Sequence, residues 1–195
     1  SLNKPIKFGF VRGPVWNFGD EDMKHGIEEF VKNAQLDIEE LDLGKDFDDA
    51  AKAHEIIMNG SIANSLMNYY QIDKSNLHPF TVKRIEAGIP VSASDYVSAI
   101  EQAKKMEQIL KQFFKKYDAI ITPAAPGQAP RDLMNTGNAI FNGYWTMMGV
   151  PAISLPFLKG KDDLPIGIQF IANWSEDLKL LEICKYILQK EKLAN

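Results

Sequence analysis

The sequence predicts a mixed α/β fold in which a β-sheet is flanked by helices on both faces. Three observations favour this class. A strand, a helix and a second strand follow one another within the first 43 residues. A long amphipathic helix later leads into a short buried strand near residue 120. Two strands joined by a polar turn, and then a helix, end the chain. Alternating strands and helices are typical of parallel sheets, and a terminal hairpin adds antiparallel strands.

The first 43 residues have the pattern of a β-α-β unit. Residues 4–12 form a short apolar run that ends at Gly13-Pro14, which predicts a strand followed by a turn. Residues 20–34 carry acidic side chains in the first turn and apolar side chains on one face, as an amphipathic helix does. Residues 36–43 alternate apolar and acidic side chains, which predicts a half-buried strand.

The middle of the chain is predicted to be helical. Residues 47–70 and 93–117 form two long helices, separated by a short helix over residues 80–87. Ser92 and Asp95 have capping-box spacing at the start of the second long helix. Residues 118–122 then form a buried strand that ends at Pro123.

The last third combines a rigid loop with regular elements. Residues 123–131 hold three prolines and a glycine, so they form a stiff irregular loop. Residues 138–149 are predicted to be helical. Residues 151–156 and 165–172 are predicted strands, and the polar turn at 159–163 makes them a hairpin. A closing helix runs from residue 175 to about residue 190, with Ser175 as its N-cap.

Composition places the chain among globular proteins with ordinary cores. Of its 195 residues, 45% are hydrophobic and 25% are charged, and no shift in composition divides it into domains. The net charge of −4 argues against a nucleic-acid partner or an anionic membrane, since both favour a basic face. No apolar run approaches the roughly 18 residues of a membrane span. A single cysteine, Cys184, excludes an internal disulfide and suits the reducing cytoplasm.

The residues themselves do not supply a complete catalytic set. The three histidines, His25, His54 and His78, lack the spacing of a helical metal site. There is no Gly-Gly pair, no phosphate-binding glycine loop and no Gly-x-Ser-x-Gly elbow. We therefore expect neither a metal nor another cofactor, and no nucleophile with its own base.

One polar segment remains open to two interpretations. Thr136, Asn138, Asn142 and Trp145 follow the stiff loop and lie among large aromatic side chains. Amides in such surroundings are costly to bury without partners. They are either satisfied core amides beside a core tryptophan, or donors in an apolar wall that orients a small polar ligand.

Four stretches of the sequence resemble the amidase-signature family, and together they reach nearly the whole chain. YDAIITPAAPGQAP resembles the family's late strand and proline-rich loop, and TGNAIFNGYWTMMGVPAISLPF resembles its stretch that ends in G-x-P-A-x-S-x-P. LPIGIQFIANWSEDLKLLEICKYI resembles the P-x-G-x-Q strand and the last helix, and IKFGFVRGPVW resembles the strand that opens the second half. Within the family, the chain is similar to the group of small-molecule amidases and aspartyl/glutamyl-tRNA amidotransferase A chains, and NGYWT is closer to the plain amidases.

The resemblance implies hydrolysis of the carbon–nitrogen bond of carboxamides by a Ser–cis-Ser–Lys triad. In the family this triad lies in a Gly/Ser-rich region of the first half, to which nothing in the chain corresponds. No catalytic residue can therefore be carried over. The resemblance instead implies a contribution to the substrate pocket from the proline-rich loop and the segment after it, with Trp16 nearby. With Thr136 from the polar segment, the expected substrate-binding residues are Pro126, Gly127, Thr136, Asn142, Trp145 and Trp16.

These expectations make residues 1–195 a single partial domain, the C-terminal part of an amidase-signature fold. Its ligand would be a small amide, and strands left without neighbours would favour association with an N-terminal half or a homodimer. Mobile loops near residues 123–136 are the other expected consequence. Two alternatives remain: a free-standing, catalytically inactive protein that binds a ligand or a partner, and an unrelated α/β enzyme whose site the sequence does not reveal.

Overall fold

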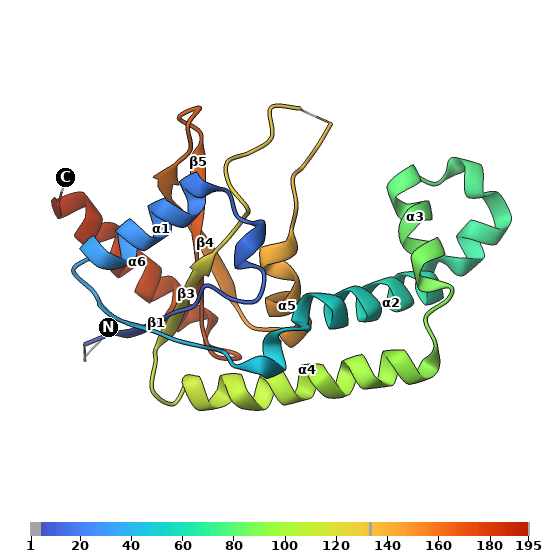
Figure 1. The fold of residues 1–195 in the computed structure, drawn as a ribbon, viewed down its shortest axis with the longest axis horizontal. Helices are drawn as coiled ribbons and strands as arrows, with labels where there is room; N and C mark the ends of the chain where they lie inside the picture. Colours follow the sequence, from blue (N-terminus) through green and yellow to red (C-terminus); the bar gives the residue numbers. More distant parts are fainter. Residues whose placement is uncertain (1–4, 133, 195) are drawn as a thin grey trace.

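A five-stranded mixed sheet forms the centre of the molecule, as predicted (Figure 1). The structure is a computed structural model, and it describes residues 5–132 and 134–194. The strand order is β2-β1-β3-β5-β4. Strands β1, β2 and β3 are mutually parallel, whereas β5 is antiparallel to both β3 and β4. The strands are β1 (Lys7–Phe10), β2 (Asp37–Glu40), β3 (Ala119–Pro123), β4 (Ala152–Lys159) and β5 (Pro165–Ile171).

The predicted β-α-β unit is confirmed at the start of the chain. Helix α1 (Glu21–Asn33) joins the parallel strands β1 and β2. Asp20 caps it, since its Oδ1 accepts a hydrogen bond of 2.8 Å from the backbone N–H of Met23. Strand β2 is shorter than the predicted residues 36–43, because only four residues pair with the four-residue β1.

Three helices form an arm that projects from the sheet (Figure 1). They are α2 (Ala50–Asp73), α3 (Pro79–Gly88) and α4 (Ala93–Phe113), and three short 3-10 helices lie at Trp16–Phe18, Lys45–Phe47 and Lys74–Asn76. Helix α2 continues through Asn59 and Gly60 without interruption. The predicted cap of α4 is confirmed, because Ser92 Oγ accepts a hydrogen bond from the backbone N–H of Asp95.

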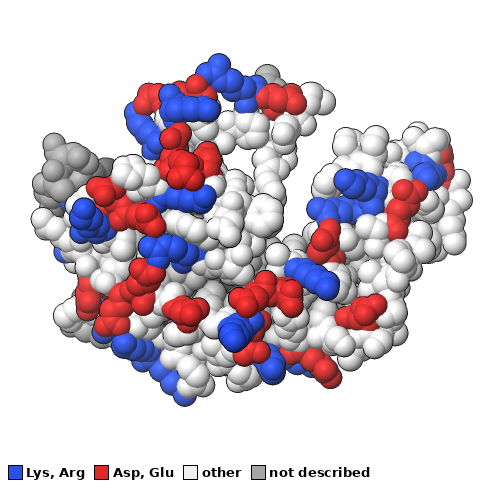
Figure 2. Space-filling view, in the orientation of Figure 1, with Lys and Arg blue, Asp and Glu red and all other residues white. Residues whose placement is uncertain are grey.

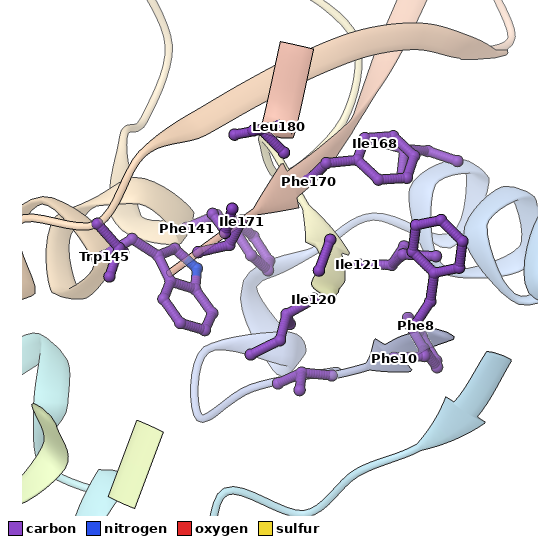
Figure 3. Packing of buried hydrophobic residues seen from close by; sticks show 14 of the residues in the cluster. Phe8, Phe10, Ile120, Ile121, Phe141, Trp145, Ile168, Phe170, Ile171 and Leu180 are labelled. Carbon is purple, nitrogen blue, oxygen red and sulfur yellow. The ribbon is translucent and has the colours of Figure 1, made fainter. Parts of the chain in front are cut away.

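Helices cover both faces of the sheet. On one face lie α1 and α6 (Asp177–Ala194), and Phe30 of α1 stacks on Phe157 of β4 with ring centroids 5.4 Å apart. Helix α5 (Ile140–Met148) covers the other face and packs against α2 and α4. Buried apolar side chains from both sides meet the strands, as Figure 3 shows for Phe8, Phe170 and Trp145.

The start of the last helix differs from the prediction. Helix α6 begins at Asp177, and the backbone N–H of Leu180 bonds to the carbonyl of Glu176, so Glu176 occupies the N-cap position. Ser175 has a left-handed φ of 61° and is therefore not the N-cap, which normally has an extended backbone. The serine instead turns the chain from β5 into the helix.

The hairpin places β4 at one edge of the sheet, and β2 forms the other edge. Strand β4 runs past Pro156, with an irregular register between Leu155 and Leu158. A proline is tolerated there because one side of an edge strand needs no partner for its N–H. None of the described helices combines the length and apolar character that crossing a membrane requires. On the face shown in Figure 2, acidic and basic side chains are interspersed.

Candidate functional site

An open cavity of about 750 Å³ lies beside the sheet face that α5 covers. Its floor comes from β4 and β5, one wall is the proline-rich loop after β3, and the opposite wall is the segment that leads into α5. Its volume falls within the range of small-molecule sites. Its lining residues are Ala124, Ala125, Pro126, Gly127, Gln128, Ala129, Pro130, Asn135, Thr136, Gly137, Asn138, Ala139, Asn142, Ser154, Pro165, Gly167 and Gln169.

The floor follows from the alternation of side chains along β5. Pro165, Gly167 and Gln169 are separated by two residues each, so they share one face of the strand and all line the cavity. Ser154 of β4 lies directly opposite Gln169. A Cβ on Gly167 would stand 2.1 Å from Ser154 Oγ, so the glycine leaves room for that hydroxyl.

Two tethers hold the proline-rich loop against its neighbours. The backbone N–H of Asp20 donates to the carbonyl of Pro126 at 2.7 Å, and Asn142 Nδ2 donates to the carbonyl of Ala124 at 3.1 Å. Gly127 lies so close to Asp20 that an added Cβ would be 1.9 Å from its Oδ2. The start of α1 and the start of α5 thus fix the loop from two sides.

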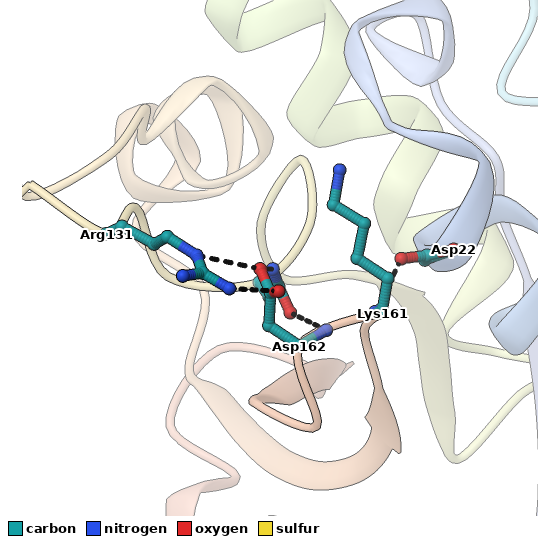
Figure 4. Close-up of polar contacts among 5 residues, drawn as sticks. Asp22, Arg131, Lys161 and Asp162 are labelled. Carbon is teal, nitrogen blue, oxygen red and sulfur yellow. Dashed lines mark hydrogen bonds and ion pairs between the residues drawn. The ribbon is translucent and has the colours of Figure 1, made fainter.

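The far end of the loop is clamped to the β4–β5 turn (Figure 4). Asp162 accepts hydrogen bonds from Gln128 Nε2 and from the guanidinium of Arg131, and its own backbone N–H donates to Gln128 Oε1 at 3.2 Å. These contacts, that with Arg131 first, hold the pKa of Asp162 below its usual value. The turn is in turn held by α1, because the backbone N–H of Lys161 donates to Asp22 Oδ2 at 2.8 Å.

Four of the six expected substrate-binding residues come together at the cavity. Pro126 and Gly127 line it from the loop, and Thr136 and Asn142 line it from the opposite wall. Asn142 also has a structural task, since its Nδ2 is engaged by the loop carbonyl.

The two expected tryptophans lie elsewhere. Trp145 is 1% exposed and belongs to the core, with its ring centroid 4.7 Å from that of Tyr144. Trp16 packs edge-on against Phe10 and beneath the Arg12 guanidinium. Neither is among the residues that line the cavity.

Buried polar atoms without partners gather on this side of the sheet. In the described part of the chain there are four of them: Thr122 Oγ1, Tyr144 Oη, Trp145 Nε1 and Gln169 Nε2. Thr122 and Gln169 are opposite each other on β3 and β5, and the two aromatic residues belong to α5. Burial raises the pKa of Tyr144, although Thr122 and Trp145 are near enough to offset part of that rise. Native proteins satisfy most buried polar atoms, so such a cluster requires an explanation.

The cavity lining offers hydroxyl and carboxamide groups. Ser154 and Thr136 supply the hydroxyls, and none of the described lining residues has a titratable side chain that could act as their base. Cys184 lies in the core, and burial raises the pKa of its thiol to about 11. A neutral, buried thiol of this kind is a packing group rather than a nucleophile.

Three residues of the cavity floor were not among the expected site residues. Ser154, Gly167 and Gln169 all belong to the hairpin, whose strands are predicted correctly. The period-2 pattern of Pro165, Gly167 and Gln169 was the available signal. It shows that the three share a face, whereas only the folded sheet shows that the proline-rich loop rises beside that face.

Comparison with known proteins identifies the family. The family model described as Amidase matches residues 1–181. The chain belongs to the amidase family. The family resemblance noted in the sequence is thereby confirmed, and the match extends over almost all of the chain.

Amidase-family relatives match this chain over part of their own length. One relative is the A chain of the glutamyl-tRNA(Gln) amidotransferase of Aliarcobacter butzleri, with 36% identity over 111 residues, which is 51% of this chain and 24% of the relative. Another is the putative amidase AmiC of Mycobacterium leprae, with 29% identity over 97 residues, covering 44% of this chain and 21% of the relative. The matched region thus spans about a quarter of the length of these relatives.

Solved amidase-family structures share the fold. One amidase crystal structure superposes with a TM-score of 0.79 at 17% identity, over 92% of this chain and 45% of the other. The allophanate hydrolase of Kluyveromyces lactis gives a TM-score of 0.75 at 18% identity, over 96% of this chain and 32% of the other. At such identities these similarities establish a common fold, and this chain spans less than half of either structure.

Proposed function

We propose that residues 1–195 form one part of an amide-hydrolysing site, in which the cavity beside β5 is one wall of the substrate pocket. The observation that carries this proposal is the convergence of Pro126, Gly127, Thr136 and Asn142 on a single cavity. These residues come from two segments on opposite sides of the cavity, and both segments are held in place by hydrogen bonds. A fixed wall with a few polar groups can orient a small carboxamide.

The proposal assigns the nucleophile and its base to residues outside these 195. Hydrolysis of an amide requires a nucleophile next to a proton acceptor, together with donors for the oxyanion. The cavity supplies two hydroxyls, but the described lining has no titratable group beside them. A Ser–cis-Ser–Lys triad on a further polypeptide segment would complete the site. Residues 1–195 would then be a partial domain whose partner is that segment.

An assay of ammonia release tests this division of labour. The purified chain is incubated with simple carboxamides, first alone and then with the polypeptide encoded immediately upstream. We expect turnover only in the mixture, and we expect Asn142→Ala in the mixture to raise KM or lower kcat. Robust turnover by the chain alone would contradict the proposal. A folded complex that hydrolyses no amide would favour the alternative of an inactive binding protein.

A further inference from the structure

Gln169 is a buried carboxamide with an unused hydrogen-bond donor. The residue is 4% exposed, and its Nε2 has no hydrogen-bond partner in the described structure. Strand pairing sets its position from both sides, with Thr122 of β3 opposite on one side and Ser154 of β4 opposite on the other. Paired residues of adjacent strands point to the same face, so these three polar side chains form a row across the sheet.

This row borders the cavity, and the gap that it faces comes from Gly167. Gln169, Ser154 and Gly167 all line the cavity. Gly167 has no side chain to fill the space in front of Gln169, and Ser154 Oγ uses only the part next to the strand. The free Nε2 therefore lies at the floor of an open site rather than deep in the apolar core.

The sheet around Gln169 does not satisfy this donor. The Thr122 hydroxyl opposite it is itself buried and unpartnered. A buried amide donor without an acceptor destabilises the fold, because it has lost its hydration without replacement. Such an atom is explained if an acceptor arrives from outside these residues, and the cavity is the side from which it can arrive.

The chemistry of the lining indicates what the acceptor belongs to. The polar groups in the lining are carboxamides and hydroxyls: Gln128, Asn135, Thr136, Asn138, Asn142, Ser154 and Gln169. These groups act through dipoles, and they pair well with a ligand that has one carbonyl oxygen and one N–H donor. A carboxylate or an ammonium group buried here would need a charged partner, which the described lining does not contain.

We propose that Gln169 is a recognition residue whose Nε2 donates to the carbonyl oxygen of an uncharged carboxamide, and that neutral carboxamides are the ligand class of this cavity. The assignment rests on the proposed function, because it takes the cavity as the substrate wall. It goes further in naming the recognising atom and in excluding amides that carry a charge next to the bound carbonyl.

Binding of benzamide, followed by NMR on the ¹⁵N-labelled chain, tests the assignment without any hydrolysis. Benzoate has the same ring with a charged head group, so it is the matched ligand control. We expect benzamide to shift the side-chain NH₂ signals of Gln169 and to bind at least tenfold more tightly than benzoate. This measurement on the unaltered protein does not depend on any variant. Equal binding of the two probes, or shifts confined to residues away from the cavity, would refute the proposal.

Replacement of the carboxamide separates recognition from a structural role. Gln169→Met has a similar volume but no polar atoms, and Gln108→Met makes the same change at an exposed position on α4. We expect Gln169→Met to weaken benzamide binding at least tenfold while its Tm stays unchanged or rises, since the lost donor had no partner. The Gln108→Met control should bind as before. A fall in Tm with unchanged binding would show that Gln169 is structural.

The outcomes also distinguish this inference from the proposed function. Benzamide binding that depends on Gln169, in a completed complex that hydrolyses no amide, would leave the recognition role standing and remove the hydrolytic one. Amide hydrolysis by the complex that is unaffected by Gln169→Met would do the reverse.

Discussion

The two faces of the central sheet are built differently. On the face under α1 and α6, Phe8 and Phe157 both pack edge-on against Phe170, each with ring centroids 6.4 Å from it. On the face under α5, the row of Thr122, Gln169 and Ser154 crosses three strands, and two of its buried polar atoms lack partners. Apolar packing of the first kind stabilises a fold, whereas unpartnered polar atoms oppose it. The contrast separates the stabilising face of the sheet from the face that is suited to bind a ligand.

Loss of an aromatic side chain from the apolar face should have the largest effect. Phe170→Ala removes a fully buried ring at the centre of the aromatic cluster. We expect a loss of about 3–5 kcal/mol in the free energy of unfolding. Urea denaturation followed by circular dichroism measures it. A loss below about 1 kcal/mol would mean that this face is not the stabilising one.

A methyl group added to the floor of the cavity should have a smaller, repairable effect. Gly167→Ala places its Cβ against Ser154 Oγ, so we expect a destabilisation of about 1–3 kcal/mol. Ser154→Ala removes the obstructing oxygen, and the double variant should recover most of the loss. A double-mutant cycle in urea measures this coupling. Additive losses would show that the two residues do not share the space.

Removal of an unpartnered hydroxyl from the polar face should cost nothing. Thr122→Val keeps the shape of a fully buried side chain and deletes the unpartnered Oγ1. We expect the free energy of unfolding to stay unchanged or to rise by up to about 1 kcal/mol. Thr122→Ser is the matched control, because it keeps the hydroxyl and should lose about 0.8 kcal/mol with the methyl group. A clear loss in Thr122→Val would reveal a partner for the hydroxyl.

Acid should weaken the α5 side before the apolar face. His54 of α2 packs against α5, where a Cβ on Gly143 would stand 2.6 Å from its Nδ1. Burial first, and then the nearby Arg84, lower the pKa of His54 below 6.5, although Glu55 opposes this shift. The unfolded chain therefore binds the proton more readily, so this contribution is complete above pH 6.5 and declines as the pH falls through that value.

Thermal melts between about pH 7.5 and pH 5 test this effect, which we expect to be the smallest of the four. His54→Gln should flatten the pH dependence in that window. The same slope in both proteins would assign it to other groups.

The fold was largely predictable from periodicity, whereas the site was only partly so. Helix α4 and the first β-α-β unit follow from local apolar spacing and from caps such as Ser92 and Asp20. Ser175 was misassigned as a cap because its left-handed backbone depends on how the chain leaves β5.

The limits at the site have a similar origin. Trp145 has the composition of a pocket residue, but its side chain turns into the core. Gln169 was missed because its importance depends on strand register and on the loop that stands beside it. Both depend on contacts between residues far apart in the sequence, which local patterns do not reveal.

The clamp that joins Asp162 to Gln128 and Arg131 has a consequence for the thermodynamics of binding. It fixes the proline-rich loop to the hairpin before any ligand arrives, and the prolines of the loop restrict its backbone further. The conformational entropy of this wall is therefore lost during folding rather than during association. A ligand would meet a preorganised surface, and its affinity would be spared the ordering penalty that a flexible loop imposes.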